Sequence, residues 1–174
     1  TSEPSEEPTW DVTPRELEHT VSGLRNYFTN IRMPSDSDSD VITLIATSEE
    51  EMKEIIGAME YDYSYEKFIE EYGEGFFDEN ALILSECISG TGSTIFKHEG
   101  VRIDEKGITV TISKKTPMMC TDDMQTRVLT TAVKKSDIGG CKTAKTIIEE
   151  HVYPVSGKIG EYDETPRDIK FTPY

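Results

Sequence analysis

The stretch from Phe76 to Phe96, FFDENALILSECISGTGSTIF, decides the fold because it holds two strand-like runs and a glycine-containing bend between them. Ala81 to Cys87 is a short apolar run typical of a buried strand, and a second strand is expected over 94–103. A phosphate cradle would need a helix directly after Gly90 to Ser93, with further Gly or Lys residues at set spacing. Ile95 and Phe96 begin a strand instead. The motif therefore predicts a turn between neighbouring strands of a sheet.

Downstream of this stretch the apolar residues repeat with a period of two. Ile108, Val110 and Ile112 alternate with polar residues, which predicts a half-exposed strand. DEKG at 104–107 is typical of a hairpin turn in which Gly107 supplies a positive φ. Further strands are expected over 126–135 and 143–153, and a helix remains an alternative for the second. The tail RDIKFTPY is compatible with an added edge strand.

Upstream, strand and helix patterns alternate. One or two strands are expected between Leu17 and Arg32, and VITLIAT at 41–47 predicts a buried strand. Ser48 and Glu51 have the spacing of a capping box, so a helix is expected to start there. A second helix is expected to start at Ser64. Each helix has an apolar stripe, and that of the first is expected to face a sheet. The stripe residues are Met52, Ile55, Ile56 and Met59 in the first helix and Tyr65, Phe68, Ile69 and Tyr72 in the second.

These patterns predict an α+β fold, a mainly antiparallel sheet or open barrel with two helices packed on one side. The chain of 174 residues is long enough for one core. Residues 1–12 are expected to form an acidic spacer containing Pro4 and Pro8, and residues 13–174 a single domain.

Composition restricts the partners. With 18 basic and 34 acidic residues the net charge is -16, which repels phosphate backbones and anionic lipids, so nucleic acid is excluded as a partner. The chain starts at Thr1 without an apolar signal region. The acidic spacer is typical of the tether of an exported protein, and a frayed terminus of a cytoplasmic protein is the alternative.

The cysteines and aspartates give weak indications of covalent or metal chemistry. Cys87 is expected to be a buried thiol, while Cys120 and Cys141 are spaced to allow a disulfide, held as a hypothesis. The run Asp36 to Asp40 imitates the opening of a calcium loop, but Val41 and Thr47 occupy the positions of its Gly and Glu. A solvated charge run is therefore favoured, and no metal or cofactor is predicted.

No catalytic residue is predicted. His19, His98 and His151 fall in separate expected strands, where a histidine is more often a polar face residue than a base. The serines at 85, 89 and 93 lie in no recognisable nucleophile motif.

Four blocks of the sequence form one recognisable series: VITLIATSEEEM, FFDENALILSECISGTGSTIFKHEGVRID, ITVTISKKTPMMCTDDM and VLTTAVKKSDI. Over about residues 20 to 140 they resemble the protease-complex-subunit PrcB-like family. Thr126-Arg127 stands where the family pattern has an aromatic residue. The resemblance implies an extracellular, non-catalytic domain, often lipid-anchored, whose name-giving member stabilises a surface protease complex.

The expected function is therefore an extracellular protein-interaction or assembly module that is not an enzyme. Its expected partner is an extracellular protein, with a protease as one candidate, and membrane contact is expected only through an N-terminal lipid anchor absent from this chain. The expected contact residues are Thr91, Ser93, Met118 and Met119, with burial of both methionines as the alternative. Rival classes are a secreted hydrolase acting on wall or peptide substrates and a calcium-dependent adhesion domain.

Overall fold

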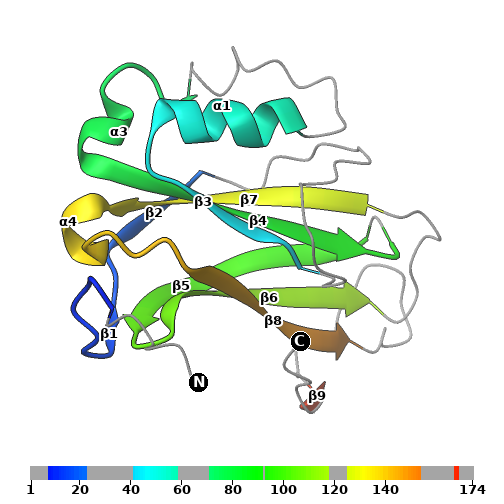
Figure 1. The fold of residues 1–174 in the computed structure, drawn as a ribbon. Coiled ribbons are helices and arrows are strands. Elements are labelled where there is room, and N and C mark those ends of the chain that lie inside the picture. Colours follow the sequence, from blue (N-terminus) through cyan, green and yellow to red (C-terminus); the bar gives the residue numbers. More distant parts are fainter. Residues whose placement is uncertain are drawn as a thin grey trace, which may run out of the picture.

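The computed structural model describes residues 8–22, 41–58, 71–91, 93–117, 125–153 and 167–168. The described strands form two sheets stacked face to face (Figure 1). The five-stranded sheet has the order β1 (Arg15–Glu16), β5 (Ile95–Asp104), β6 (Gly107–Pro117), β8 (Ala144–Tyr153) and β9 (Arg167–Asp168). The four-stranded sheet has the order β2 (His19–Ser22), β7 (Gln125–Lys134), β4 (Asn80–Ser89) and β3 (Thr43–Ala46). The described helices are α1 (Glu49–Ala58), α3 (Phe76–Glu79) and α4 (Lys135–Ile138).

The predicted class is confirmed, since the fold is α+β and its sheets are mainly antiparallel. Among the described pairs β6 and β8 are parallel, and the others are antiparallel. The expectation of one sheet or an open barrel is corrected, because the strands divide between two sheets. β4 pairs with β7 along its whole length, from Asn80↔Lys134 to Ser89↔Gln125, and not with β5.

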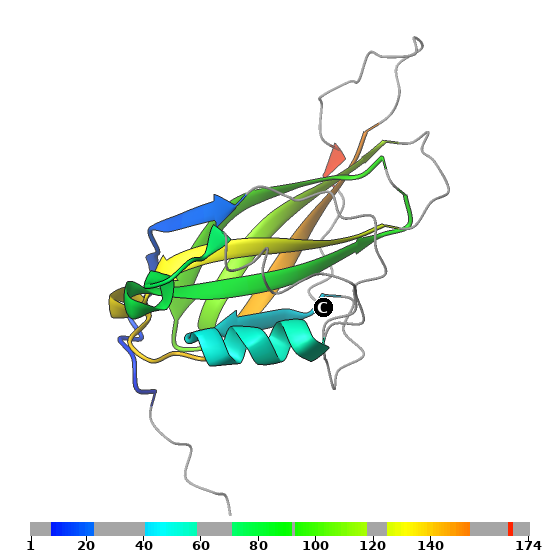
Figure 2. The same ribbon diagram turned by 90° about the horizontal axis from the view of Figure 1, so that it is seen from above.

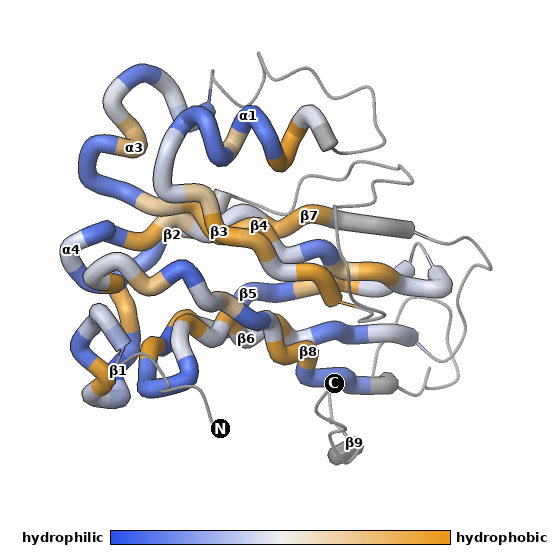
Figure 3. The backbone as a smooth tube through the Cα atoms, viewed as in Figure 1, coloured by the Kyte–Doolittle hydropathy of each residue, from blue (hydrophilic) through white to orange (hydrophobic). Residues whose placement is uncertain are grey.

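The main core lies between the sheets. Alternate residues of each central strand point inward, as the pleat requires. Figure 3 shows apolar segments along the inner strands of both layers. The buried members of this core are Leu17, Ala81, Ile83, Cys87, Phe96, Val101, Ile103, Ile108, Val110, Ile112, Leu129, Val133, Ile138 and Cys141. Each large aliphatic side chain buried here contributes about 1.5–3 kcal/mol.

A second cluster covers the outer face of the four-stranded sheet. Met52 and Ile56 of α1 are buried against Leu82 and Leu84 of β4, and Figures 1 and 2 show α1 lying along this sheet. Because β4 is covered on both faces, its sequence is a continuous apolar run and not an alternating one. Most of the second expected helix lies outside the described residues, as does Met59. The short α3 was not predicted.

The start of α1 differs from the predicted capping box in one bond. Ser48 Oγ accepts the Glu51 N–H at 3.1 Å, as expected. The Glu51 carboxylate does not return to Ser48 but accepts from the backbone N–H of Thr47 at 2.7 Å and from its hydroxyl at 2.8 Å. Lys142 Nζ forms an ion pair with the same carboxylate, which links α1 to the segment before β8.

The predicted hairpin between β5 and β6 is confirmed. Asp104 faces Gly107, which has φ 101°, and the Ile108 N–H donates to the Thr143 carbonyl at 2.8 Å. The expectation that β6 is half-exposed is wrong, because Thr109 and Ser113 are buried. β6 lies between β5 and β8, and side chains of neighbouring strands cover it; Ser113 Oγ donates to the Glu99 carboxylate at 2.7 Å.

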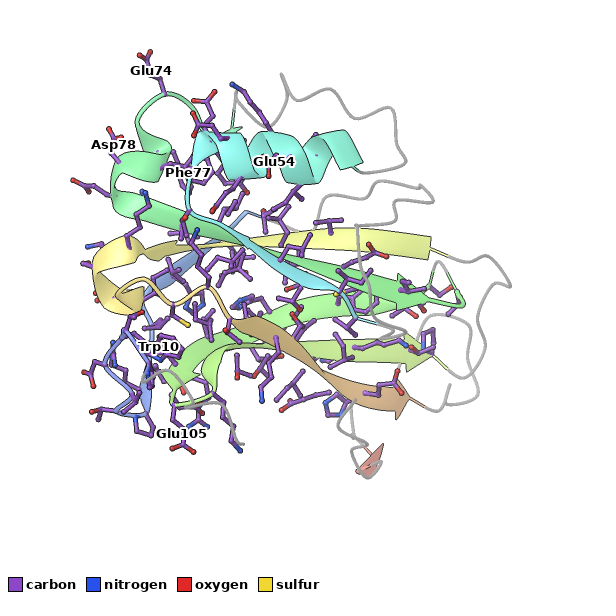
Figure 4. The ribbon with its side chains drawn as sticks, viewed as in Figure 1. Trp10, Glu54, Glu74, Phe77, Asp78 and Glu105 are labelled. Carbon is purple, nitrogen blue, oxygen red and sulfur yellow. The ribbon has the colours of Figure 1, made fainter. Side chains whose placement is uncertain are left out.

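The strands expected near 126–135 and 143–153 are confirmed as β7 and β8, and the tail contributes the edge strand β9. Trp10 falls in the stretch expected to be a spacer, yet it packs against the main core. Its indole N–H donates to the Asp104 carbonyl at 3.0 Å, and Figure 4 shows it at the same end of the molecule as Glu105.

Candidate interaction surface

The bend between β4 and β5 is held by its own hydroxyl groups. Ser89 Oγ lies 2.6 Å from Thr94 Oγ1, which is 3.1 Å from Thr116 Oγ1 on β6. The Thr91 N–H donates to Ser89 Oγ at 3.3 Å, and the Ser93 N–H donates to Thr91 Oγ1 at 3.2 Å. Ser and Thr side chains commonly fix tight turns in this way.

This network confirms that the bend connects two strands, and it corrects one detail. Because β4 and β5 belong to different sheets, the bend carries the chain from one sheet to the other and does not join neighbours in one sheet. The N–H groups of Thr91 and Ser93 are directed to hydroxyls of the bend itself. They are therefore not arranged as the anion-binding amides of a phosphate loop.

The expected contact residues fall in different settings. Thr91 is buried, so its side chain organises the bend and offers little surface to a partner, whereas Ser93 is half-buried. Met118 and Met119 lie outside the described residues.

A cavity of about 230 Å³ lies between the sheets at the bend end. Cys87 and Phe96 contribute to it from the two sides of the bend, and Val41, just before β3, lines another part. β3 pairs with β4 only as far as Ser85, so the last residues of β4 extend beyond this neighbour. We call this space the bend-end cavity; its lining residues are Val41, Cys87, Ile88, Phe96, Lys114, Ile148 and Glu150.

One ion pair supplies the charges of this cavity. Lys114 Nζ lies 2.6 Å from Glu150 Oε1, and these residues face each other in the parallel pairing of β6 with β8. The Lys114 side chain is 20% exposed and that of Glu150 52% exposed. The pair therefore lies where the cavity meets solvent, and the more accessible group is the carboxylate.

Two large apolar side chains beside the bend are exposed. Ile88 is 38% exposed and also lines the cavity, while Ile95, on the other side of the bend, is 60% exposed. Single exposed isoleucines are common on protein surfaces, but an exposed isoleucine at the edge of an apolar cavity resembles the anatomy of a binding hot spot.

The histidines do lie on separate strands, as predicted, but they are not all polar face residues. His98 pairs with the core residue Ile112 and therefore points between the sheets. Its ring centroid lies 4.7 Å from that of His19, and burial together with the charge of His19 lowers the pKa of His98 to about 4. The hydroxyls of Ser85 and Ser89 lie within hydrogen-bond distance of Thr146 and Thr94.

The described cysteines and carboxylates bear on the expected covalent and metal chemistry. Cys141 is a buried free thiol, which contradicts the hypothesis of a Cys120–Cys141 bridge; Cys120 itself lies outside the described residues. Cys87 is buried, as expected. Burial raises the pKa of the Cys141 thiol. Within the described ranges no three His, Cys, Asp or Glu side chains gather as a metal site, and Asp36 to Asp40 lie outside those ranges.

No helix within the described part of the chain has the length and apolar character needed to span a bilayer. Comparison of the chain with family models, with curated proteins and with solved structures gives no match.

Proposed function

We propose that the protein is a non-catalytic interaction or assembly module that binds another protein through its bend end. The observation that carries this proposal is the exposed side chain of Ile88 at the edge of the bend-end cavity. Binding energy in protein interfaces concentrates where an apolar residue or pocket is surrounded by polar groups that exclude water. Ser93 and the Lys114–Glu150 pair supply such groups here.

The hydroxyl network of the bend supports the same proposal. A surface whose loops are already ordered pays less conformational entropy when it binds. Ser89, Thr91 and Thr94 are buried and hydrogen-bonded to one another across the bend, so these three residues are ordered before a partner arrives.

The resemblance to the PrcB-like family supports an extracellular location, a lipid anchor and a protein of a surface protease complex as the partner. These remain parts of the proposal. We also propose that two helices share one side of the fold, since Tyr72, the last residue of the second expected helix, joins Met52 and Ile56 of α1 in one cluster.

The proposal is tested with a photo-crosslinking residue placed at Ile88 and, in a second protein, at Val12. Val12 is 40% exposed and lies close to Trp10, away from the bend. It therefore controls for non-specific cross-linking from an exposed apolar position. After irradiation in an extract of the native cell envelope, we expect a discrete adduct from position 88 only. The captured protein, once purified, should bind the unmodified chain. Equal adducts from both positions, or no binding by the purified protein, would contradict the proposal.

A further inference from the structure

We propose that the bend-end cavity is an anchor pocket that accepts one aromatic or large aliphatic side chain from a basic segment of the partner. This inference rests on the proposed function and names the chemistry of the partner. It follows from the size of the cavity, from its lining and from the charge around its mouth.

The size of the cavity fits a ring. A dry apolar cavity of about 150 Å³ in a protein interior accommodates benzene. The bend-end cavity measures about 230 Å³ and opens to solvent, so its volume is sufficient for a Phe or Leu side chain. Removal of a side chain of this size from water contributes about 1.5–3 kcal/mol, which corresponds to roughly 10- to 150-fold in affinity.

The lining matches an apolar side chain. Phe96, Ile148 and Val41 present hydrocarbon, and the Cys87 thiol behaves as a small apolar group. The inner wall is fixed, because Cys87 and Phe96 belong to the main core. An aromatic ring can therefore make contacts on several sides while its backbone stays at the surface.

The charges favour a basic neighbour of the anchor residue. The Glu150 side chain is 52% exposed, whereas that of Lys114, its ion-pair partner through Oε1, is only 20% exposed. A cation approaching the mouth meets this carboxylate on a protein whose net charge is -16. Opposite charge of this kind steers association and disfavours acidic competitors.

The test uses three capped tripeptides, Lys-Phe-Lys, Lys-Ala-Lys and Glu-Phe-Glu, titrated to millimolar concentration against the whole chain while the NMR signals of Ile148 and Phe96 are followed. We expect Lys-Phe-Lys to shift these signals and each of the other two peptides to bind at least about tenfold more weakly. A Glu150→Gln variant should reduce the preference for Lys-Phe-Lys over Glu-Phe-Glu.

A cavity-filling variant provides the control. Cys87→Met should remove the difference between Lys-Phe-Lys and Lys-Ala-Lys while the protein still melts cooperatively, and Ile148→Phe serves the same purpose if Cys87→Met does not fold. Equal affinity for Lys-Phe-Lys and Lys-Ala-Lys, or unchanged Ile148 signals, would overturn the anchor pocket. If Cys87→Met binds the cross-linked partner as tightly as the native chain does, the anchor-pocket proposal is wrong, but the proposed interaction function is unaffected. If no partner is captured at position 88 while Lys-Phe-Lys still binds, the proposed interaction function is wrong.

Discussion

The rings of His19 and His98 lie 4.7 Å apart at the place where the N-terminal segment changes sheets. β1 pairs with β5, the Leu17 N–H donates to the Val101 carbonyl, and β2 then pairs with β7 in the other sheet. His19 is opposite Val133 and His98 opposite Ile112; His98 is half-buried, whereas His19, at the start of β2, is exposed. His98 Nε2 is buried and has no hydrogen-bond partner among the described groups.

This arrangement predicts acid sensitivity. Burial, the charge of His19 and a weaker opposing effect of Glu99 place the pKa of His98 at about 4, below its ordinary value of 6.5. Between these pH values the unfolded chain binds a proton that the folded protein does not, so the free energy of unfolding should fall as pH is lowered from 6.5 to 4.

Urea unfolding at several pH values measures this dependence. His98→Gln should flatten the curve in that window. An unchanged slope in His98→Gln would contradict the assignment.

The contacts of Glu51 predict a second, more acidic pH range in which the free energy of unfolding depends on pH. Its ion pair with Lys142 and its bond from the Thr47 N–H lower the pKa of this carboxyl from 4.5 to about 2. A depressed carboxyl pKa stabilises the folded state above pH 4.5, and this contribution is lost as pH falls toward 2.

Glu51→Gln should cost about 1 kcal/mol at pH 7 and less at pH 2, because the helix start loses its charged acceptor. Lys142→Met removes only the ion pair and should cost less. Chemical denaturation at the two pH values checks both variants, and a loss for Glu51→Gln that is independent of pH would show that the carboxylate is not the stabilising group.

The glycines of the two turns should differ in their tolerance of a side chain. Gly107 has φ 101°, and a Cβ atom there would lie 2.5 Å from the Thr143 carbonyl oxygen. Gly90 has nothing within 4 Å of the corresponding position. Gly107→Ala should cost about 2 kcal/mol or more, and Gly90→Ala should change the free energy of unfolding by less than about 0.5 kcal/mol. Denaturant titration of both variants provides the measurement, and similar costs would contradict the two turn geometries.

Trp10 should stabilise the domain although it lies in a stretch with the composition of a spacer. Its indole contacts the main core and donates to Asp104. Trp10→Phe should cost about 1 kcal/mol through the lost hydrogen bond, and Trp10→Ala about 2 kcal/mol through lost packing as well. Thermal unfolding of the two variants separates these effects; no destabilisation by Trp10→Ala would place the start of the domain after Trp10.

Local patterns in the sequence were sufficient to predict most strands. The continuous apolar run at 81–84 and the alternation from Ile108 to Ile112 each reflect how one strand faces its surroundings. The partition into two sheets was not predictable in this way. The pairing of Ile83 with Thr131, for example, joins segments far apart in the chain, and no local period specifies which strand lies beside which.

The candidate surface was predicted only in part. The bend itself was expected, but the burial of Thr91 was not, although the Ser and Thr content of the stretch from Ser89 to Thr94 is a signal for hydroxyl-stabilised turns. One feature of the sequence indicates the cavity. Lys114 continues the inward alternation of Val110 and Ile112, and a charged residue at an inward position indicates an ion pair or an opening in the core.

The most direct test of the interaction surface compares Ile88→Asp with Ile147→Asp in binding to the purified cross-linked partner. Both isoleucines are 38% exposed on strands, and Ile147 lies on the opposite face of its strand from the cavity-lining Ile148, so the two substitutions are matched in chemistry. We expect Ile88→Asp to raise the dissociation constant at least about 30-fold, the loss of one hot-spot residue, and Ile147→Asp to change it by less than about threefold. Equal dissociation constants for the native chain and Ile88→Asp, with both proteins folded, would show that Ile88 is not part of the binding surface.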